Sequence, residues 1–277
     1  MKIIPRPAVT IITPVYNGAA YLEQAIESAR RQTYEDWELL VINDGSTDAT
    51  GEIAERCARR DSRIRYFANE ANLGISRTRN RGLAVAEGTL VAMLDSDDLW
   101  LASNKLEAQV RAFERAGGGE EPLGVLGTWM IRIDERGLER QGRASRVSFP
   151  ETDSDIRRSL LYRDHIAHSS VLFLKQAAIE AGGYDERLAI AEDHDLWLKI
   201  ARNYALRTLP IYALGYRSHS RNITRTRALK GALEELKVIS RHRREYRGFA
   251  FGFSRALVRL AWVTLRTSPR VVGITGR

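Results

Sequence analysis

The sequence predicts an α/β protein in which a mainly parallel sheet is flanked by helices. Apolar, β-branched segments alternate with segments of helical spacing, and this alternation is typical of parallel strands joined by helices. Polar turns follow the first strands, and the fourth strand runs directly into acidic residues. The expected strands span residues 8–13, 37–42, 63–67 and 89–94, and the expected helices span 19–32, about 48–60 and 74–86.

The second half of the chain has a more mixed pattern. A glycine-rich break at 117–122 precedes it, and residues 136–152 predict a polar loop or hairpin. Further strands are expected at 125–133, 169–174 and 206–217, with helices at 175–181 and 192–202. The first half therefore has the size of a nucleotide-binding βαβ unit, and we expect the second half to build over it.

The composition is that of an ordinary globular protein, with 44% hydrophobic and 28% charged residues. The single cysteine, Cys57, excludes an intramolecular disulfide framework and fits a reducing compartment. We expect no signal peptide, because the first residues contain no long apolar segment. We also expect no transmembrane helix, because no apolar run reaches the necessary length.

The net charge of +8 is unevenly distributed. Residues 221–277 contain 14 Lys and Arg against 3 Asp and Glu, whereas the remainder contains 29 against 32. A basic segment of this kind usually binds an anionic partner, such as phospholipid, nucleic acid or a polyanionic substrate. The basic character therefore belongs to the tail and not to the body of the protein.

An acidic stretch follows the fourth expected strand, where residues 91–94 lead into Asp95, Asp97 and Asp98. The end of a buried parallel strand lies at the carboxyl edge of the sheet, where open α/β folds bind ligands. Neighbouring carboxylates repel each other unless a cation lies between them, and hard oxygen ligands suit Mg²⁺ or Mn²⁺. The alternative is structural, since Asp97 or Asp98 can cap the next helix.

Two earlier turns, at 13–17 and 43–48, should lie at the same edge because they follow the first two strands. Tyr16 offers a ring face on which a base can stack, and Asp44 can accept from a base N–H group such as uracil N3. Each also has a structural alternative, as a packing aromatic and as a turn or cap residue. The helix start at 72–80 suits either a diphosphate or an ordinary cap followed by a solvated basic face.

A second acidic cluster, Glu192 and Asp193, begins the helix expected at 192–202. A structural cap is one explanation, because acids are favoured at a helix N-terminus. Above a metal–nucleotide site, such a carboxylate can instead take a proton from an incoming hydroxyl. His168 and His194 can be ligands or bases, although isolated histidines are more often structural. The sequence shows no zinc-type Cys/His spacing, Gly-x-Ser-x-Gly elbow or Walker-type loop, which disfavours a zinc site, a serine hydrolase and a P-loop NTPase.

Six motifs occur along the chain in the order typical of one enzyme family. They are VTIITPVYN at 9–17, VINDGSTD at 41–48, NLG to RNRG at 72–82, LDSDD at 94–98, GGYDE at 182–186 and EDHDLW at 192–197. Together they resemble the inverting, nucleotide-sugar-dependent glycosyltransferases with the GT-A fold (bacterial-type family 2), over about residues 8–220. The resemblance implies a GT-A domain with a nucleotide-sugar-binding half at 1–98 and an acceptor-binding and catalytic half at 99–220, before the tail at 221–277.

The resemblance also implies roles for individual residues. Asp193 would be the catalytic base, with Glu192 beside it, in a single displacement without a covalent sugar intermediate. Asp97 would bind the divalent cation, Mg²⁺ or Mn²⁺, that bridges the diphosphate, with Asp95 near the ribose or the metal and His219 as a further metal or diphosphate contact. The donor, expected to be a UDP-sugar, would be held by Thr13, Pro14, Tyr16, Asn17, Asp44, Asn72, Arg79, Asp95, Ser96 and Asp97.

The basic tail is expected to form an amphipathic helix over 241–266. At 100° per residue, an apolar face opposes a narrow stripe formed by Arg241, Arg244, Arg255, Arg259 and Arg266. Such a helix fits the surface of anionic lipid, or it can pack on the catalytic domain or on a second copy of the chain. A cluster that can bind the diphosphate of a lipid-linked acceptor comprises Arg217, Arg221, Arg225 and Arg227.

The sequence therefore predicts a metal-dependent inverting glycosyltransferase that moves a sugar to a hydroxyl of a glycan or lipid-linked acceptor. We expect it to act in cell-surface polysaccharide or glycolipid assembly, in the cytoplasm and peripherally at the inner face of the cell membrane. No nucleic-acid partner is expected, and a homodimer is left open.

One rival function is that of a sugar-nucleotide-forming nucleotidyltransferase, which is disfavoured because the first strand is not followed by a phosphate loop rich in Gly and Arg. The other is a non-catalytic basic protein that binds membrane or nucleic acid, disfavoured by the acidic body and by the intact set of Asp95, Asp97 and Asp193.

Overall fold

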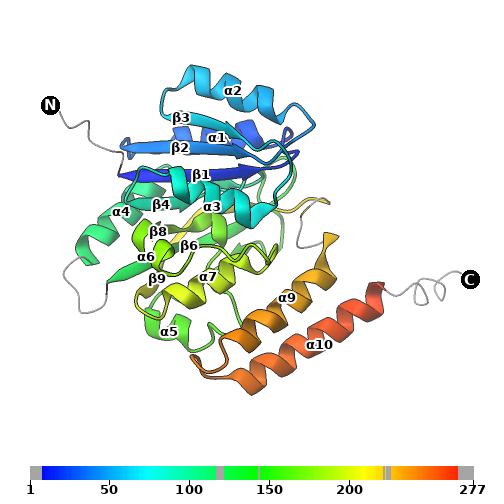
Figure 1. Cartoon of the computed structure of the whole chain (residues 1–277). Coiled ribbons are helices and arrows are strands. Elements are labelled where there is room, and N and C mark those ends of the chain that lie inside the picture. Colours follow the sequence, from blue (N-terminus) through cyan, green and yellow to red (C-terminus); the bar gives the residue numbers. More distant parts are fainter. Residues whose placement is uncertain (1–7, 117–121, 143, 221, 223–225, 268–277) are drawn as a thin grey trace, which may run out of the picture.

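The alternating first half folds close to its predicted boundaries. The computed structural model describes residues 8–116, 122–142, 144–220, 222 and 226–267 (Figure 1). The strands of the first half pair in parallel and are β1 (Val9–Val15), β2 (Trp37–Asn43), β3 (Ile64–Ala68) and β4 (Leu90–Met93). The connecting helices are α1 (Leu22–Arg30), α2 (Thr50–Arg60) and α3 (Ile75–Val85). β1 and β2 are buried along their whole length, as expected for parallel strands that are covered on both faces.

The second half adds strands to the same sheet through antiparallel pairs and one long parallel pair, formed by residues 123–133 and 205–217. Its strands are β5 (Leu99–Trp100), β6 (Leu123–Ile133), β7 (Arg146–Val147), β8 (Leu172–Leu174) and β9 (Ala205–Arg217). Its helices are α4 (Lys105–Ala116), α5 (Asp153–Arg157), the 3-10 turn η1 (His168–Ser170), α6 (Lys175–Glu180) and α7 (Glu192–Ile200). β8 joins the two halves, because it pairs antiparallel with both β4 and β6. In the described part of the chain the strand order is β3-β2-β1-β4-β8-β6-β9-β5, with β7 paired to β6.

The sheet separates two apolar cores, because neighbouring residues of a strand face opposite sides. Ile12 of β1 lies in the core that includes residues of α3, α6 and α7, whereas Ile11 lies in the core that includes residues of α1, α2 and α4. Figure 1 shows helices on both faces of the sheet, the layered arrangement that the alternating pattern predicts. The polar ends of the strands are thereby left at the edge of a rigid framework.

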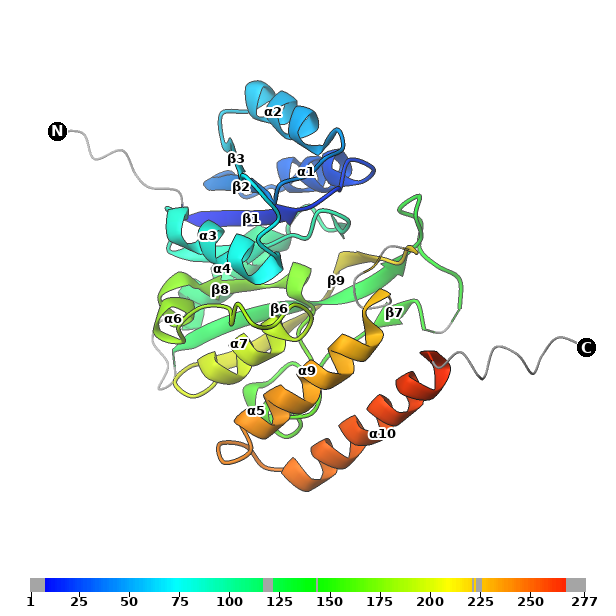
Figure 2. The ribbon, with the colours of Figure 1, turned by 45° about the vertical axis from the view of Figure 1, so that its right-hand side comes forward.

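The tail forms two helices, α9 (Ala228–Arg241) and α10 (Phe249–Thr267), so the helix predicted over 241–266 is confirmed from 249 onward and is wrong before it. Gly248 interrupts it with a φ of 87°, and a Cβ at this position would lie 2.8 Å from the Tyr162 ring. Arg241 and Arg244 therefore share no helical face with the arginines of α10. Figures 1 and 2 show α9 lying between α7 and α10. Among the described helices, none combines the length and apolar character needed to cross a bilayer.

Candidate active site

The turns that follow β1, β2 and β4 meet at one edge of the sheet. β1 pairs in parallel with both β2 and β4, so segments 13–17, 43–48 and 95–97 emerge on the same side. The first two turns are linked directly, because the Asn17 side-chain oxygen accepts a hydrogen bond of 2.8 Å from the backbone N–H of Thr47. The convergence that the sequence predicts from strand order is thus present in the structure.

The residues of the first turn differ in exposure. Tyr16 is 52% exposed, so its ring is accessible to a ligand. Thr13 is fully buried, and its hydroxyl has no hydrogen-bond partner among the described residues. Pro14 is also buried within β1. Ser96 packs closely against this turn, since a Cβ built on Gly18 would lie 3.1 Å from the Ser96 hydroxyl.

Asp44 shapes the loop that leads into α3. Its buried carboxylate accepts hydrogen bonds from the Asn69 side chain at 2.7 Å and from the backbone N–H groups of Leu73 and Gly74 at 2.8 and 2.9 Å. Asn72 is exposed within this loop. Asp44 therefore has the structural role considered for it, and a carboxylate with about four acceptor sites retains one for a ligand N–H group.

Arg79 connects the two acidic clusters. Its guanidinium, on the buried side of α3, forms an ion pair of 2.8 Å with Asp95 at the end of β4 and a second, closer ion pair with Glu192 at the start of α7. The Arg79 and Glu192 side chains are only 5% and 6% exposed. Arg79, predicted as a donor contact, is thus the link that brings the strand end and the helix start into one site.

Mutual attraction fixes the charges of this cluster. Although burial opposes ionisation, the neighbouring Arg79 holds the pKa of Asp95 below its usual value, and the two acids hold the pKa of Arg79 above its own. Burial raises the pKa of Glu192, and Arg79 offsets part of that rise. Breaking one pair would leave another buried charge uncompensated, which is costly.

His168 and Tyr184 pack against the same cluster. His168 Nδ1 lies 3.9 Å from an Asp95 oxygen, and His168 Nε2 shares a 2.9 Å hydrogen bond with the Tyr184 hydroxyl. Burial, aided by the positive charge of Arg79, lowers the pKa of His168 to about 3. The imidazole is therefore neutral at physiological pH and acts as a structural neighbour of Asp95.

Asp97 and His219 form a second polar pair at the sheet edge. His219 Nε2 lies 2.8 Å from Asp97 Oδ2, and the Asn222 side chain lies 3.5 Å from the same oxygen. The structure thus brings together two of the three predicted metal ligands, Asp97 and His219. The third, Asp95, forms an ion pair with Arg79 instead. Within the described ranges, no group of three or more His, Cys, Asp and Glu residues is arranged to hold a metal ion. A cation here would need further oxygen ligands from its substrate.

A shallow hollow of about 430 Å³ adjoins His219. Two arginines, Arg136 and Arg140, line it together with Asp134, Glu135, Ser218 and Ser220. The loop at 134–140, whose role the sequence did not indicate, thus places both acidic and basic side chains beside the Asp97–His219 pair. This hollow is a candidate position for part of a polar substrate.

Arg217 is not available to bind an acceptor diphosphate, which corrects the prediction for this residue. Its side chain is fully buried and donates to the backbone carbonyls of Asp97 and Glu135 at 2.6 and 2.7 Å. It therefore supports the backbone beneath the site. Of the other arginines in that predicted cluster, Arg227 is exposed, and Arg221 and Arg225 lie outside the described residues.

Asp193 lies in the first turn of α7, where its partly exposed carboxylate accepts a 2.7 Å hydrogen bond from the backbone N–H of His194. Burial raises its pKa well above the usual value, and the nearby carboxylates of Asp164 and Glu192 add to the rise. A carboxylate with a raised pKa is a stronger base, and general bases are tuned in this way. Asp193 therefore has the electrostatic character expected of a proton acceptor.

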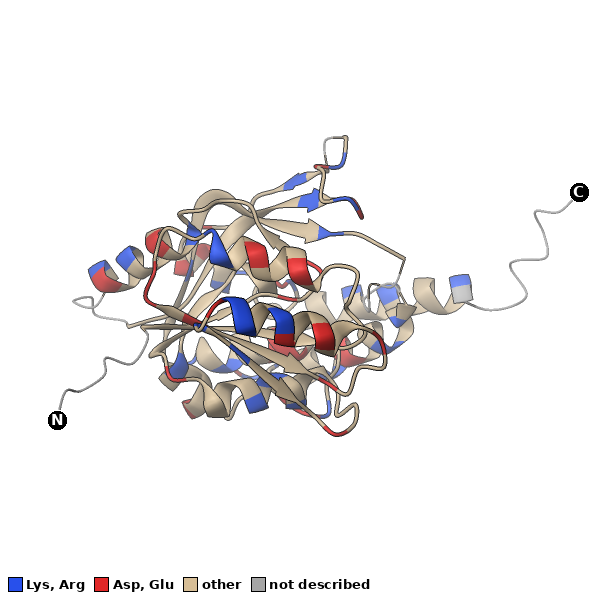
Figure 3. Ribbon diagram, turned by 90° about the horizontal axis from the view of Figure 1, so that it is seen from above, with Lys and Arg blue, Asp and Glu red and all other residues tan. Residues whose placement is uncertain are grey.

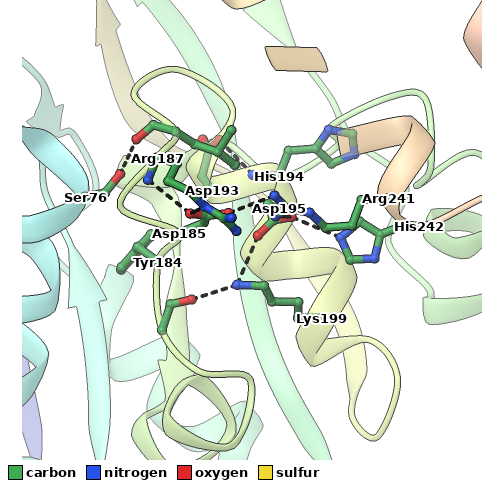
Figure 4. A network of polar contacts seen from close by, with 12 residues as sticks. Ser76, Tyr184, Asp185, Arg187, Asp193, His194, Asp195, Lys199, Arg241 and His242 are labelled. Atoms are coloured by element: carbon green, nitrogen blue, oxygen red, sulfur yellow. Dashed lines mark hydrogen bonds and ion pairs between the residues drawn. The ribbon is translucent and has the colours of Figure 1, made fainter. Parts of the chain in front are cut away.

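Polar contacts join helix α7, which carries Asp193, to the tail. Asp195 is fully buried and contacts Lys199, Arg241 and His242 at 3.0, 2.7 and 3.0 Å (Figure 4). Glu234 of α9 accepts hydrogen bonds of 2.9–3.3 Å from three consecutive backbone N–H groups, at 189–191, immediately before α7. The sequence analysis did not identify these contacts, although Glu234 is one of only three acids in the basic tail and Asp195 lies in the EDHDLW motif.

Residues 10–182 match the family described as Glycosyl transferase family 2. The chain belongs to this family and has the GT-A fold, as its motifs predict. It is therefore a glycosyltransferase, and neither the nucleotidyltransferase nor the non-catalytic alternative is supported.

Two relatives align with most of the chain. Uncharacterized glycosyltransferase MJ1057 of Methanocaldococcus jannaschii is 27% identical over 241 residues, which cover 86% of this chain and 80% of the relative. Uncharacterized glycosyltransferase RT0329 of Rickettsia typhi is 30% identical over 265 residues, which cover 95% and 76%. Other relatives are longer: the chain spans 32% of an uncharacterized glycosyltransferase of Rickettsia felis.

Solved structures share the fold at low sequence identity. S. aureus TarS 1-349 in complex with UDP-GlcNAc superposes with a TM-score of 0.69 at 19% identity, covering 94% of this chain and 73% of that one. The mannosyltransferase PcManGT from Pyrobaculum calidifontis, in complex with GDP-Man and Mn²⁺, superposes with a TM-score of 0.67 at 18% identity, covering 98% and 79%. These likenesses establish the fold.

Proposed function

We propose that this glycosyltransferase is inverting, depends on a divalent metal and uses a nucleotide-diphosphate sugar, most simply a UDP-sugar. In the proposed reaction Asp193 takes the proton of an acceptor hydroxyl, whose oxygen forms a bond to the anomeric carbon of the sugar. The bond from that carbon to the diphosphate oxygen breaks, and the nucleoside diphosphate leaves. The observation that carries the proposal is the bridge made by Arg79, because it joins the strand end beside Asp97 to the first turn of the helix that bears Asp193.

The donor is proposed to lie over the turns that follow β1, β2 and β4. Tyr16 would stack on the base, and the remaining acceptor site of Asp44 would receive a base N–H group. The other proposed donor contacts are Thr13, Pro14, Asn17, Asn72, Asp95, Ser96 and Asp97. Two of the structural neighbours hold UDP-GlcNAc and GDP-Man respectively, which supports a nucleotide sugar and leaves the base to be tested.

The divalent cation is proposed to bind at Asp97 and His219. Magnesium is usually held by one or two protein carboxylates together with substrate phosphates, and Mn²⁺ accepts imidazole as well as oxygen ligands. A carboxylate oxygen and an imidazole nitrogen 2.8 Å apart at the sheet edge fit such a shared site. A bound cation would offset the negative charge of the departing diphosphate. Asp95, engaged by Arg79, is proposed to position Asp97 and the donor.

The acceptor is proposed to be a hydroxyl of a glycan or of a lipid-linked glycan at the inner face of the cell membrane. The basic tail supports an acceptor that carries negative charge. We propose that the enzyme acts in cell-surface polysaccharide or glycolipid assembly. No nucleic-acid partner is proposed, because the body of the protein is slightly acidic.

Calorimetric titration tests the donor and the metal together. UDP, GDP and dTDP are titrated into wild type and Asp97→Ala, each with and without Mn²⁺. We expect UDP to bind wild type only with Mn²⁺, and we expect this binding to vanish in Asp97→Ala. Preference for GDP or dTDP would keep the enzyme class and change the base. If none of the three nucleotides bound wild type, the proposed donor site would be wrong.

A further inference from the structure

Helix α10 has two apolar faces: one packs on the rest of the protein, and the other is exposed except that Phe251 makes an edge contact with Tyr162, 5.0 Å between ring centres. The packed face contains Phe249, Phe253, Ala256 and Val263, which lie against the core or are buried. The outward stripe consists of Phe251, Val258, Trp262 and Leu265, which are 63%, 70%, 53% and 64% exposed. Their spacing places all four side chains on one side of a helix. A helix that is apolar on both faces normally has a partner on each of them.

The charges beside the outward stripe indicate what that partner is. Arg255, Arg259 and Arg266 lie along one flank of the stripe, and α10 contains no acidic residue. Glu235 of α9 pairs with the first two of these arginines, which leaves the flank positive. The guanidinium of Arg266 stacks on the exposed Trp262 ring, 3.9 Å from its centre. Figure 3 shows α10 extending toward the C-terminus without acidic positions.

We propose that the outward stripe of α10 lies in the surface of a membrane that contains anionic lipid, with the arginine flank at the lipid phosphates. Exposed Phe, Trp and Leu beside arginines are typical of helices that lie in the plane of a membrane interface. Such a helix need not cross the bilayer, and α10 lacks the apolar length to do so. A second copy of the chain fits less well, because its stripe would bring an equal set of arginines and no acids from α10 to pair with them.

The position of the stripe relative to the site gives it a role. Figures 1 and 2 show the end of α10 on the side of the molecule toward which β1 points, where the proposed site lies. Membrane contact along α10 would therefore bring the bilayer toward the site. The role of bringing the bilayer toward the site rests on the proposed function, whereas the binding of α10 to a membrane does not. It deepens that function by identifying the part of the tail that meets the lipid.

Sedimentation with lipid vesicles tests the proposal. The full chain is mixed with vesicles of phosphatidylcholine, with or without phosphatidylglycerol, and the bound fraction is measured. We expect wild type to bind only the vesicles that contain phosphatidylglycerol. Val258→Glu should weaken this binding roughly tenfold or more, because it puts a charge in the apolar stripe, and Arg266→Gln should weaken it less. Ile179→Glu, an exposed apolar position on α6, is the matched control and should bind like wild type.

Several outcomes would overturn the proposal. The proposal would be wrong if wild type bound neither kind of vesicle. It would also be wrong if Val258→Glu and Ile179→Glu bound the vesicles equally well. Sedimentation velocity without lipid checks the remaining alternative: self-association that Val258→Glu abolishes would assign the stripe to a second copy. Titration of the nucleotides in the absence of vesicles keeps the two proposals apart, because Val258→Glu should bind them as wild type does. Failure of wild type in that titration would count against the donor site alone.

Discussion

Arg79 and Glu192 form a buried ion pair although 113 residues separate them in the chain. The pair joins α3 of the first half to α7 of the second half, and Arg79 extends the link to Asp95. Because both side chains are almost inaccessible, the guanidinium is confined between the two acids. Arg79 therefore links the strand end that precedes Asp97 to the start of the helix that carries Asp193.

Replacement of Arg79 by methionine should destabilise the protein by about 3–5 kcal/mol, the usual cost of leaving buried charges unpaired. Transfer activity should also fall, because Asp95 and Glu192 would then repel each other. Urea unfolding followed by circular dichroism gives the free energy of unfolding. Arg77→Met is a matched control on the same helix, since its ion pair with Glu186 is about half exposed. Equal destabilisation by both substitutions would contradict the role given to Arg79.

The raised pKa of Asp193 should set the acid limb of the pH–rate profile. A general base must be ionised, so kcat falls as the pH drops through its pKa. Burial and the neighbouring acids raise that pKa, so the fall should begin at higher pH than for an exposed aspartate. Asp193→Asn should abolish transfer while nucleotide binding, measured by calorimetry, stays close to that of wild type. A variant that retained substantial transfer would exclude Asp193 as the base.

Strand order and turn chemistry were enough to predict the first half of the fold and the edge at which the site lies. The contacts within the site were not predictable in this way. Nothing local to Arg79 indicates that its partners are Asp95 and Glu192, since such long-range pairs depend on how two halves pack. The tail was mispredicted for a local reason, because a helical projection continued through Gly248, whose positive φ interrupts the helix. Periodicity also does not separate the face of α10 that packs from the face that stays exposed.

Glu234 should act as a positioning residue for the base. Its carboxylate accepts hydrogen bonds from the three backbone N–H groups before α7, and the neutral amide of a glutamine would accept weaker ones. Glu234→Gln should lower kcat by up to about 100-fold through misplacement of Asp193, with little change in nucleotide affinity. Glu235→Gln, next to it on α9 but paired only with arginines of α10, should leave kcat unchanged. A fall in nucleotide affinity that matches the fall in kcat would indicate a wider structural role instead.

Asp195 should make the protein less stable in acid. Burial opposes ionisation, but His242, Lys199 and Arg241 outweigh it and lower the pKa of Asp195 to about 2 in the folded state. A carboxylate whose pKa is depressed by folding stabilises the folded state above its unfolded pKa and loses that contribution as the pH falls toward the folded pKa. With an unfolded pKa near 3.9, the loss should reach about 1 kcal/mol by pH 3.

The comparison of wild type with Asp195→Asn isolates this contribution. Free energies of unfolding are measured in urea at pH 7, 5 and about 3, a range that spans the titration of aspartate. Asp195→Asn should be less stable than wild type at pH 7, because a neutral amide cannot form the ion pairs with Lys199 and Arg241, and the difference should shrink toward pH 3. Glu55→Gln, at an exposed position of α2, should show almost no difference at any pH. A difference between wild type and Asp195→Asn that stayed constant with pH would show that the charge of Asp195 does not stabilise the contact between α7 and α9.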